Sequence, residues 1–246
     1  MPDTAIKTNQ VIRHGDSREV LKKLTNGTVA SLITDPPFGV NNQSNMAKTQ
    51  EGKKYARKIA NDESPEQALS VFEEVMEVAL PKMREQSDIY VFTSWQVLEM
   101  WLLRTERLFG EAGYTRKGIG VWAKDGPGMG DLDSWGMGME FILYYKRGGR
   151  PRSDDRRNFV FNTPQIRPAQ LIHPHEKPIA LLQALIKHST SPGDIVVDPF
   201  GGSGSLARAA RELNRNALCV EYDEINYNLA VKKLNDEASG FNFDEA

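Results

Sequence analysis

Residues Asp194–Ser205 read DIVVDPFGGSGS, a short β-branched run that ends in an acid, a proline and three glycines. The pattern predicts a buried strand, a tight glycine-rich turn and then the start of a helix. In an open α/β sheet the ligand crevice lies at the carboxyl ends of such strands. Free N–H groups at the start of the next helix favour an anionic group. We therefore expect a ligand at this turn.

A second carboxylate, Glu221, follows the next short strand at a spacing of about 20 residues, which suits a hydrogen bond to ribose hydroxyls. The glycine spacing is G-G-x-G and not the G-x-G-x-x-G of dinucleotide sites, and no G-x-x-x-x-G-K-[ST] stretch occurs. A nucleotide, NAD or S-adenosylmethionine remains possible at this point, and so does a plain strand-to-helix turn.

Strands and helices alternate around this turn. Strands are predicted at Val11–His14, Ala30–Thr34, Asp88–Thr93, Ile195–Val197 and Ala217–Val220, with an antiparallel hairpin of Gly118–Ala123 and Met139–Tyr145. Helices are predicted after the N-cap Ser64 and at Trp95–Phe109, Ile179–His188, Ser205–Leu213 and Glu224–Leu234. This order favours an α/β fold with a largely parallel sheet and helices on both faces.

A second strand, closed by Thr34, runs into Asp35-Pro36-Pro37-Phe38. Two prolines hold the backbone extended, so the Asp35 carboxylate and the Pro36 carbonyl would project from the sheet edge as acceptors. Phe38 offers a flat ring beside them. Two acceptors and a ring suit a planar base with an exocyclic amine, although a rigid turn with an Asp cap would look the same.

The composition bounds the class of protein. The chain has 246 residues, 39% hydrophobic, and a mean hydropathy of −0.50, with no apolar run of the roughly 18 residues that a membrane span needs. The polar stretch from Met1 to Gln10 has no signal-peptide core, so nothing points to export and we expect a cytoplasmic protein. One cysteine, Cys219, and four scattered histidines predict neither disulfides nor a metal site.

These motifs together resemble the S-adenosylmethionine-dependent amino-methyltransferases of DNA, the N6-adenine/N4-cytosine family. Asp35–Phe38 matches its catalytic D-P-P-F motif, and Asp198–Gly204 its cofactor motif. His173–Pro178 is similar to its H-P-x-x-K-P signature, and Gly15-Asp16 to its G-D signature. The stretches Trp122-Ala123-Lys124 and Met139-Glu140 also resemble the family. The catalytic motif precedes the cofactor motif, as in the β class, and the resemblance spans about residues 11 to 234.

The resemblance implies a single domain over residues 1–246 with a Rossmann-like methyltransferase fold, a mostly parallel seven-stranded sheet and an antiparallel hairpin. It implies methyl transfer to the N6 amine of adenine in double-stranded DNA, with base flipping. The catalytic group would be Asp35, Pro36, Pro37 and Phe38. The cofactor would contact Asp16, Asp35, His173, Lys177, Asp198, Pro199, Phe200, Gly202, Ser203, Gly204, Glu221 and Tyr222. In this set Asp16 would bind the adenine amine, and Lys177 would hold the cofactor carboxylate or cap the next helix.

The chain departs from the family in three places. Phe38 replaces the usual tyrosine, Gly201 occupies the free position of the cofactor motif, and the segment before His173 is short for a recognition region. We expect a mobile basic loop at about residues 41–61 and a short recognition-like insertion at about 147–172. DNA contacts are expected from Lys53, Lys54, Arg57, Arg150, Arg152, Arg156 and Arg157.

Taken over the whole chain, the net charge of −2 and the pI of about 6.1 argue against a nucleic-acid partner, but the charge is unevenly distributed. Residues 41–60 and 146–172 hold 12 basic and 3 acidic residues, which leaves 19 basic and 30 acidic residues elsewhere. This predicts an acidic body with two basic loops, and DNA binding that weakens with salt.

Three alternatives remain from the sequence: a cytosine-N4 enzyme, an RNA methyltransferase, and an inactive DNA-binding module of the same fold. A homodimer is compatible with the family, and a nuclease partner, if one exists in a restriction-modification pair, would be a separate chain.

Overall fold

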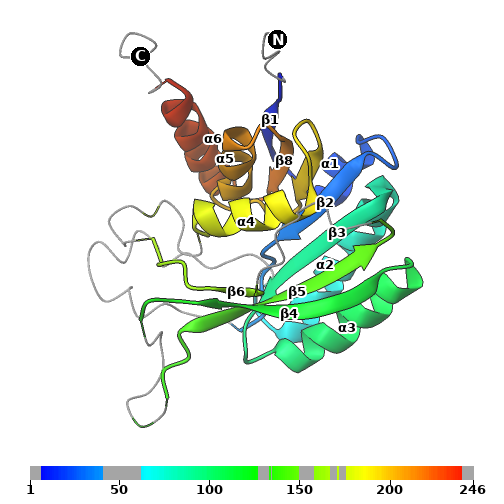
Figure 1. Cartoon of the computed structure of the whole chain (residues 1–246), viewed down its shortest axis with the longest axis vertical. Helices are drawn as coiled ribbons and strands as arrows, with labels where there is room; N and C mark the ends of the chain where they lie inside the picture. Colours follow the sequence, from blue (N-terminus) through cyan, green and yellow to red (C-terminus); the bar gives the residue numbers. More distant parts are fainter. Residues whose placement is uncertain are drawn as a thin grey trace.

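The computed structural model describes residues 7–40, 62–126, 133, 135–149, 158–166, 171 and 176–239. A twisted sheet forms the middle layer and helices cover both of its faces (Figure 1). The strands are β1 (Gln10–His14), β2 (Val29–Thr34), β3 (Met83–Thr93), β4 (Thr115–Ala123), β5 (Met139–Arg147), β6 (Val160–Phe161), β7 (Ile195–Asp198) and β8 (Asn216–Glu221). The helices are α1 (Ser17–Lys22), α2 (Pro65–Ala79), the 3₁₀ turn η3 (Leu80–Lys82), α3 (Leu98–Glu111), α4 (Ile179–Ser189), α5 (Ser205–Glu212) and α6 (Glu224–Ser239).

The sheet runs in the order β1-β8-β7-β2-β3-β5-β4-β6. The first five strands are mutually parallel, β5 is antiparallel to both β3 and β4, and β6 pairs parallel with β4. The predicted antiparallel hairpin is therefore confirmed as β4–β5. Since the order reverses between β7 and β2, the loops after these two strands lie side by side at the carboxyl edge.

The α/β class and the helices on both faces are confirmed, but the count of seven strands was wrong. The described residues form eight strands, because Val160 and Phe161 add a short edge strand beside Val121 and Trp122. Two residues between polar neighbours carry no periodic signal, so only pairing with β4 reveals this strand.

The central strands bury both faces, which gives two separate cores. Side chains alternate across a strand, and along β3 Tyr90 and Phe92 join one core while Ile89 and Val91 join the other. The first core packs against α4, α5 and α6, and the second against α1, α2 and α3 (Figure 1). The near-continuous apolar runs of these strands are typical of strands covered on both faces.

Local signals explain where the helices begin. Ser64 caps α2 by accepting from the Gln67 N–H at 3.2 Å, as the sequence predicts, and a proline occupies the first position. Helix α3 begins at Leu98 and not at Trp95, because the Val97 N–H donates to the Ser94 carbonyl and closes a turn first.

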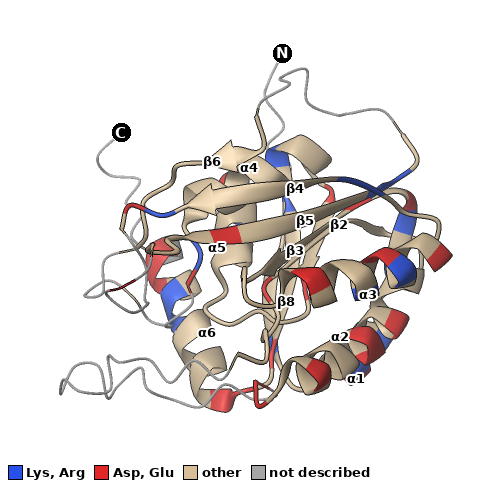
Figure 2. Ribbon diagram, turned by 90° about the horizontal axis from the view of Figure 1, so that it is seen from below, with Lys and Arg blue, Asp and Glu red and all other residues tan. Residues whose placement is uncertain are grey.

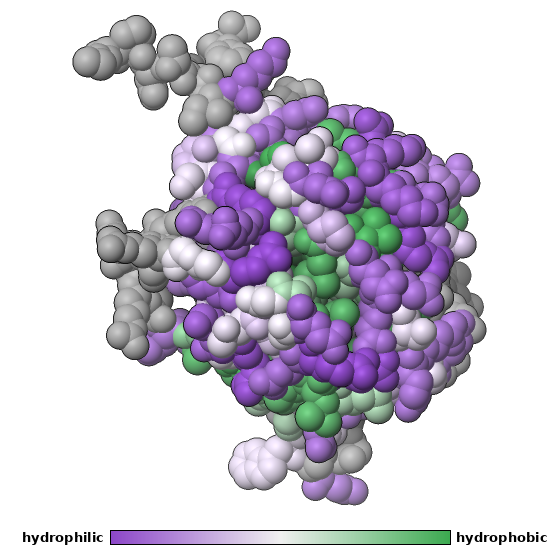
Figure 3. Space-filling model, turned by 90° about the vertical axis from the view of Figure 1, so that its right-hand side faces the viewer, coloured by the Kyte–Doolittle hydropathy of each residue, from purple (hydrophilic) through white to green (hydrophobic). Residues whose placement is uncertain are grey.

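The surface is uneven in charge and polarity. Acidic residues recur along α2 and α3 (Figure 2), in keeping with the acidic body that the charge pattern predicts. On the side drawn in Figure 3, a strip of hydrophobic residues crosses an otherwise hydrophilic face. Among the helices of the described ranges, none has the length and apolar composition that a membrane span requires.

Candidate active site

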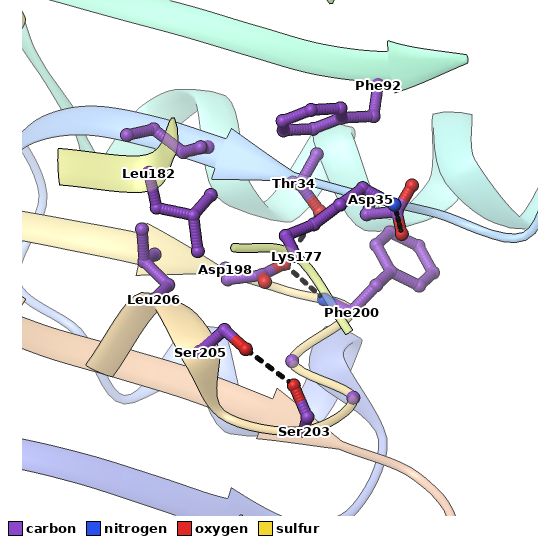
Figure 4. A pocket seen from close by; sticks show the side chains of 13 residues that line it. Thr34, Asp35, Phe92, Lys177, Leu182, Asp198, Phe200, Ser203, Ser205 and Leu206 are labelled. Atoms are coloured by element: carbon purple, nitrogen blue, oxygen red, sulfur yellow. Dashed lines mark hydrogen bonds and ion pairs between the residues drawn. The ribbon is translucent and has the colours of Figure 1, made fainter. Parts of the chain in front are cut away.

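The two sequence motifs meet at one edge of the sheet. Asp35 follows β2, Pro199 follows β7, and these strands are parallel neighbours. The Thr34 hydroxyl donates to Asp198 Oδ1 at 2.8 Å, which ties the ends of the two strands together. The pocket between them is lined by Thr34, Asp35, Lys177, Asp198, Phe200 and Gly202, among others (Figure 4).

The glycine-rich turn is held closely against β8. The Gly201 N–H donates to the Val220 carbonyl at 2.7 Å, and the Gly202 N–H to Glu221 Oε2 at 2.7 Å. A Cβ on Gly201 would lie 2.9 Å from the Cβ of Cys219, so the position that the motif leaves free is occupied by glycine for a steric reason. Gly204 has a φ of +70°, which glycine adopts without strain.

Asp198 is a buried carboxylate at the floor of this turn. Its Oδ1 accepts from the Thr34 hydroxyl and from the Phe200 N–H at 3.0 Å. Burial raises the pKa of Asp198 to about 7, although both hydrogen bonds oppose that rise. The Phe200 ring stacks on Phe72 of α2, at 6.3 Å between centroids, and anchors the turn to the second core.

Two further predicted cofactor residues already have protein partners. Asp16 is the N-cap of α1 and pairs with the Arg18 guanidinium, whose hydrogen bond lowers the pKa of Asp16. Both oxygens of Glu221 accept backbone N–H groups, those of Gly202 and of Asp223. A carboxylate has about four acceptor positions, so each group retains capacity for a ligand.

The start of α1 reaches the cofactor motif, because the Ser17 hydroxyl donates to the Pro199 carbonyl at 2.5 Å. Ser203 is buried and its hydroxyl shares a hydrogen bond with Ser205 at 2.7 Å. Tyr222 is 65% exposed beyond the end of β8. The described members of the predicted cofactor set thus lie around one turn, with Tyr222 at its outer side.

The D-P-P-F motif lies along the other wall. Pro36 is buried, and Phe38 is half-buried with its ring edge-on to Trp101 at 6.4 Å. Gly39 donates its N–H to the buried Asp62 at 2.6 Å, and a Cβ on Gly39 would collide with the Ser64 backbone. Residues 39 and 62 are therefore adjacent, on either side of the first basic segment.

Lys177 is inserted between two carboxylates. Its ammonium group donates to Asp35 Oδ2 and lies 3.1 Å from Glu140 Oε2. Lys124 donates to the other oxygen of Glu140 at 2.6 Å. We call these four residues, Asp35, Lys124, Glu140 and Lys177, the site cluster. Since Lys177 bonds to carboxylates and α4 has no side-chain cap, the predicted capping role was wrong.

The site cluster sets the charge state of Asp35. Burial raises the pKa of Asp35 to about 6, with Lys177 opposing the rise and Glu140 adding to it. Burial would also raise the pKa of Glu140, but Lys177 and Lys124 outweigh it and hold that pKa below its usual range. Asp35 Oδ1 is buried and has no hydrogen-bond partner among the described residues.

The sequence left Glu140 and Lys124 without a role. A signal was present, since Glu140 is the one charged residue in the strand segment MEFILYY, where burial of an unpaired charge would be costly. The Lys177 ammonium also lies 5.1 Å from the Phe92 ring and 5.9 Å from the Trp122 ring. Residues from β2, β3, β4, β5 and the approach to α4 thus meet here.

Several predicted residues lie outside the described residues. They are His173, Lys53, Lys54, Arg57, Arg150, Arg152, Arg156 and Arg157, together with the whole of the predicted basic loop at 41–61 and half of the recognition-like insertion at 147–172.

The chemistry of the pocket suits S-adenosylmethionine. Asp35, Asp198 and Glu221 surround a turn that opens on apolar groups such as Phe200 and Leu206. Carboxylates favour a cationic sulfonium and accept from ribose hydroxyls, and the apolar groups suit the methylene and ring parts of the molecule.

Comparison with known proteins agrees with this geometry. The family model for DNA methylases, N6_N4_Mtase, matches residues 29–232. The DNA adenine methyltransferase YhdJ of Escherichia coli is 26% identical over 270 aligned residues, covering 96% of this chain and 86% of YhdJ.

Solved structures have the same fold. The crystal structure of the M1.HpyAVI–SAM complex superposes with a TM-score of 0.67 at 22% identity, covering 92% of this chain and 99% of that one. The cytosine-N4-specific PvuII DNA methyltransferase gives a TM-score of 0.67 at 17% identity, covering 94% and 91%. The chain belongs to the N6/N4 DNA methylase family, the S-adenosylmethionine-dependent amino-methyltransferases of DNA.

Proposed function

We propose that this protein transfers a methyl group from S-adenosylmethionine to the N6 amine of adenine in double-stranded DNA. The observation that carries the proposal is Asp35 Oδ1, a buried acceptor without a partner among the described residues, beside the glycine-rich turn. An amine that enters the pocket would give this oxygen the hydrogen bond that it lacks.

The residues of the pocket supply alignment and charge stabilisation. The lone pair of an aromatic amine is delocalised into its ring, so the amine is a poor nucleophile. When bound, S-adenosylmethionine supplies an electrophilic methyl group on a sulfonium. Asp35 and the Pro36 carbonyl would accept from the two amine hydrogens and favour the pyramidal geometry of attack. As the N–C bond forms and the methyl–sulfur bond breaks, the sulfur would leave as a neutral thioether and the nitrogen would become cationic. Asp35 could then take the proton from the nitrogen.

The cofactor roles follow from the turn. Asp198, Phe200, Gly202 and Gly204 would line the methionine and ribose side, and Glu221 would accept from the ribose hydroxyls. Asp16 would accept from the adenine amine of the cofactor while it still pairs with Arg18. Phe38 would stack on the flipped base with the part of its ring that Trp101 leaves open.

Adenine is favoured over cytosine for two reasons. The motif is D-P-P and not S-P-P, and the relative YhdJ, which aligns over 96% of the chain, is named as an adenine enzyme. Cytosine N4 is the second candidate, because PvuII DNA methyltransferase shares the fold and is named as cytosine-N4-specific.

The test is to incubate the protein with duplex DNA and methyl-labelled cofactor, digest the DNA to nucleosides and identify these by mass spectrometry. We expect N6-methyladenine. N4-methylcytosine alone would overturn the adenine assignment. Transfer to RNA but not to duplex DNA would favour an RNA enzyme, and DNA binding without any transfer would favour an inactive binding module.

The DNA contacts of Lys53, Lys54, Arg57, Arg150, Arg152, Arg156 and Arg157 stay predictions from the charge pattern. One contact supports the expectation for the first basic segment: the Gly39 N–H donates to Asp62 at 2.6 Å, so the residues that flank this segment lie next to Phe38. A homodimer, a separate nuclease and a cytoplasmic location also stay predictions.

A further inference from the structure

The site cluster contains more charge than alignment of an amine requires. Salt bridges link its four side chains in a row, from Lys124 to Glu140, from Glu140 to Lys177 and from Lys177 to Asp35. Lys177 is only 6% exposed. Burying a charge without a partner is expensive. An arrangement of a second carboxylate and two ammonium groups around a catalytic carboxylate therefore calls for a role.

The contacts are unequal at the two oxygens of Asp35. Oδ2 accepts from the Lys177 ammonium, whereas Oδ1 has no partner among the described residues. Lys177 in turn lies against Glu140, and Glu140 accepts from Lys124 at 2.6 Å. The faces of Phe92 and Trp122 restrict where the ammonium group can lie. The result is a chain of contacts that fixes one oxygen and leaves the other for a ligand.

We propose that Lys177 is a positioning residue: its ammonium group holds Asp35 Oδ2 and keeps the carboxylate ionised, while Glu140, itself held by Lys124, sets the strength of that effect. Asp35 Oδ1 is then presented to the substrate amine as a charged acceptor. This inference rests on the proposed function, and it assigns to Lys177 a task other than holding the cofactor carboxylate.

The charges around Asp35 act in opposite directions. Lys177 and Lys124 favour the ionised form of Asp35, whereas Glu140 disfavours it, and Asp198 on β7 is the other acid that interacts with it. Removing the positive charge of Lys177 should raise the pKa of Asp35, and removing the negative charge of Glu140 should lower it. A purely structural role would not produce shifts of opposite sign.

The first experiment measures Asp35 directly in the protein without substrate. Carboxyl ¹³C NMR of aspartate-labelled protein is followed against pH, and Asp35→Asn identifies the signal. Relative to wild type, we expect the midpoint to rise by about one pH unit or more in Lys177→Met and to fall in Glu140→Gln. Lys146→Met, a matched lysine on the far end of β5, should leave it unchanged. Equal shifts in the first two variants, or no shift in either, would overturn the inference.

The second experiment follows kcat against pH at saturating DNA and cofactor. The acid limb should move upward in Lys177→Met and downward in Glu140→Gln, with KM values changed by less than about threefold. Lys177→Arg should return the limb toward its wild-type position, even if the rate stays low, because it restores the charge. If Lys177→Met does not fold, Glu140→Gln and Lys177→Arg still decide the result. A higher KM for the cofactor at unchanged kcat would point instead to binding of the cofactor carboxylate by Lys177.

The two proposals fail in different ways. If wild-type protein methylates no nucleic acid while the NMR midpoints shift as expected, the proposed function fails and the electrostatic inference holds. If wild type is active but the midpoints and the acid limb stay in place, the positioning inference alone fails.

Discussion

Two buried groups of charged side chains occupy opposite ends of β5. The site cluster lies where β5 begins, at Glu140. The other, which we call the tyrosine cluster, consists of Asp88, Tyr90, Tyr144, Lys146 and His188 and lies near the end of the strand. Both lie beside α4, because Lys177 precedes this helix and His188 is near its end. Each pairs a buried aspartate with a lysine.

The difference lies in the partners of the aspartate. Asp88 Oδ1 accepts from the Tyr144 hydroxyl at 2.9 Å and from Lys146 at 3.2 Å, and Tyr144 stacks flat on Tyr90 at 4.7 Å. Asp35 has one lysine partner and a buried oxygen without any among the described residues. Donors that are fixed on strands stabilise the fold, whereas an acceptor without a partner is available to a ligand.

The largest effect that tests this difference is on the rate. Asp35→Asn replaces a charged acceptor by a neutral one, so methyl transfer should fall on the order of 10²- to 10³-fold. Asp88→Asn removes the same charge from the tyrosine cluster and should leave kcat per folded molecule within about twofold. Steady-state transfer of labelled methyl groups measures both. Comparable losses in the two variants would mean that the clusters do not differ in role.

A smaller effect is expected on the pH dependence of stability. The folded-state pKa of Asp198 is raised to about 7, above the unfolded value near 4, so the native state binds the extra proton between these values. The contribution of Asp198 to stability therefore falls as the pH rises from about 4 to about 7, and Asp198→Asn should remove that loss, on the order of 4 kcal/mol at pH 8.

Chemical denaturation at several pH values checks this. Asp88→Asn serves as the comparison. Burial raises the pKa of Asp88 as well, but Lys146 and Tyr144 oppose that rise. A parallel pH dependence for wild type and Asp198→Asn would contradict the prediction.

The smallest effect concerns the tyrosine cluster and the neighbouring Tyr145. Tyr144→Phe removes a hydrogen bond to a buried carboxylate and should lower the free energy of unfolding by about 2 kcal/mol. Tyr145→Phe, its neighbour on β5, removes a neutral 2.9 Å bond to Thr105 and should cost about 1 kcal/mol. Thermal or urea unfolding measures the two, and activity at 25 °C should not change. A larger loss of unfolding free energy in Tyr145→Phe than in Tyr144→Phe would contradict the expectation that a hydrogen bond to a charged group stabilises the fold more than a neutral one.

A feature could be predicted from the sequence when the residues that form it are close together in the chain. The strand-turn-helix at Asp198–Gly204, the Ser64 cap and the β4–β5 hairpin depend on neighbouring residues, and all were predicted. The first five residues of β3 were missed. Four of them, Arg84–Ser87, are polar, and Arg84 pairs with Asp194, which is 110 positions away in the chain.

Local sequence patterns were enough to predict the layered α/β fold, the family and the two motifs that face each other, because strand periodicity, caps and glycine turns are local properties. Tertiary structure decided that Lys177 pairs with Asp35, 142 positions earlier, and that Glu140 lies against the same ammonium group. Tertiary contacts also set which oxygen of Asp35 has no partner among the described residues, and why a side chain at Gly201 would collide with Cys219. These outcomes depend on burial and on contacts between distant segments, and no local pattern encodes either.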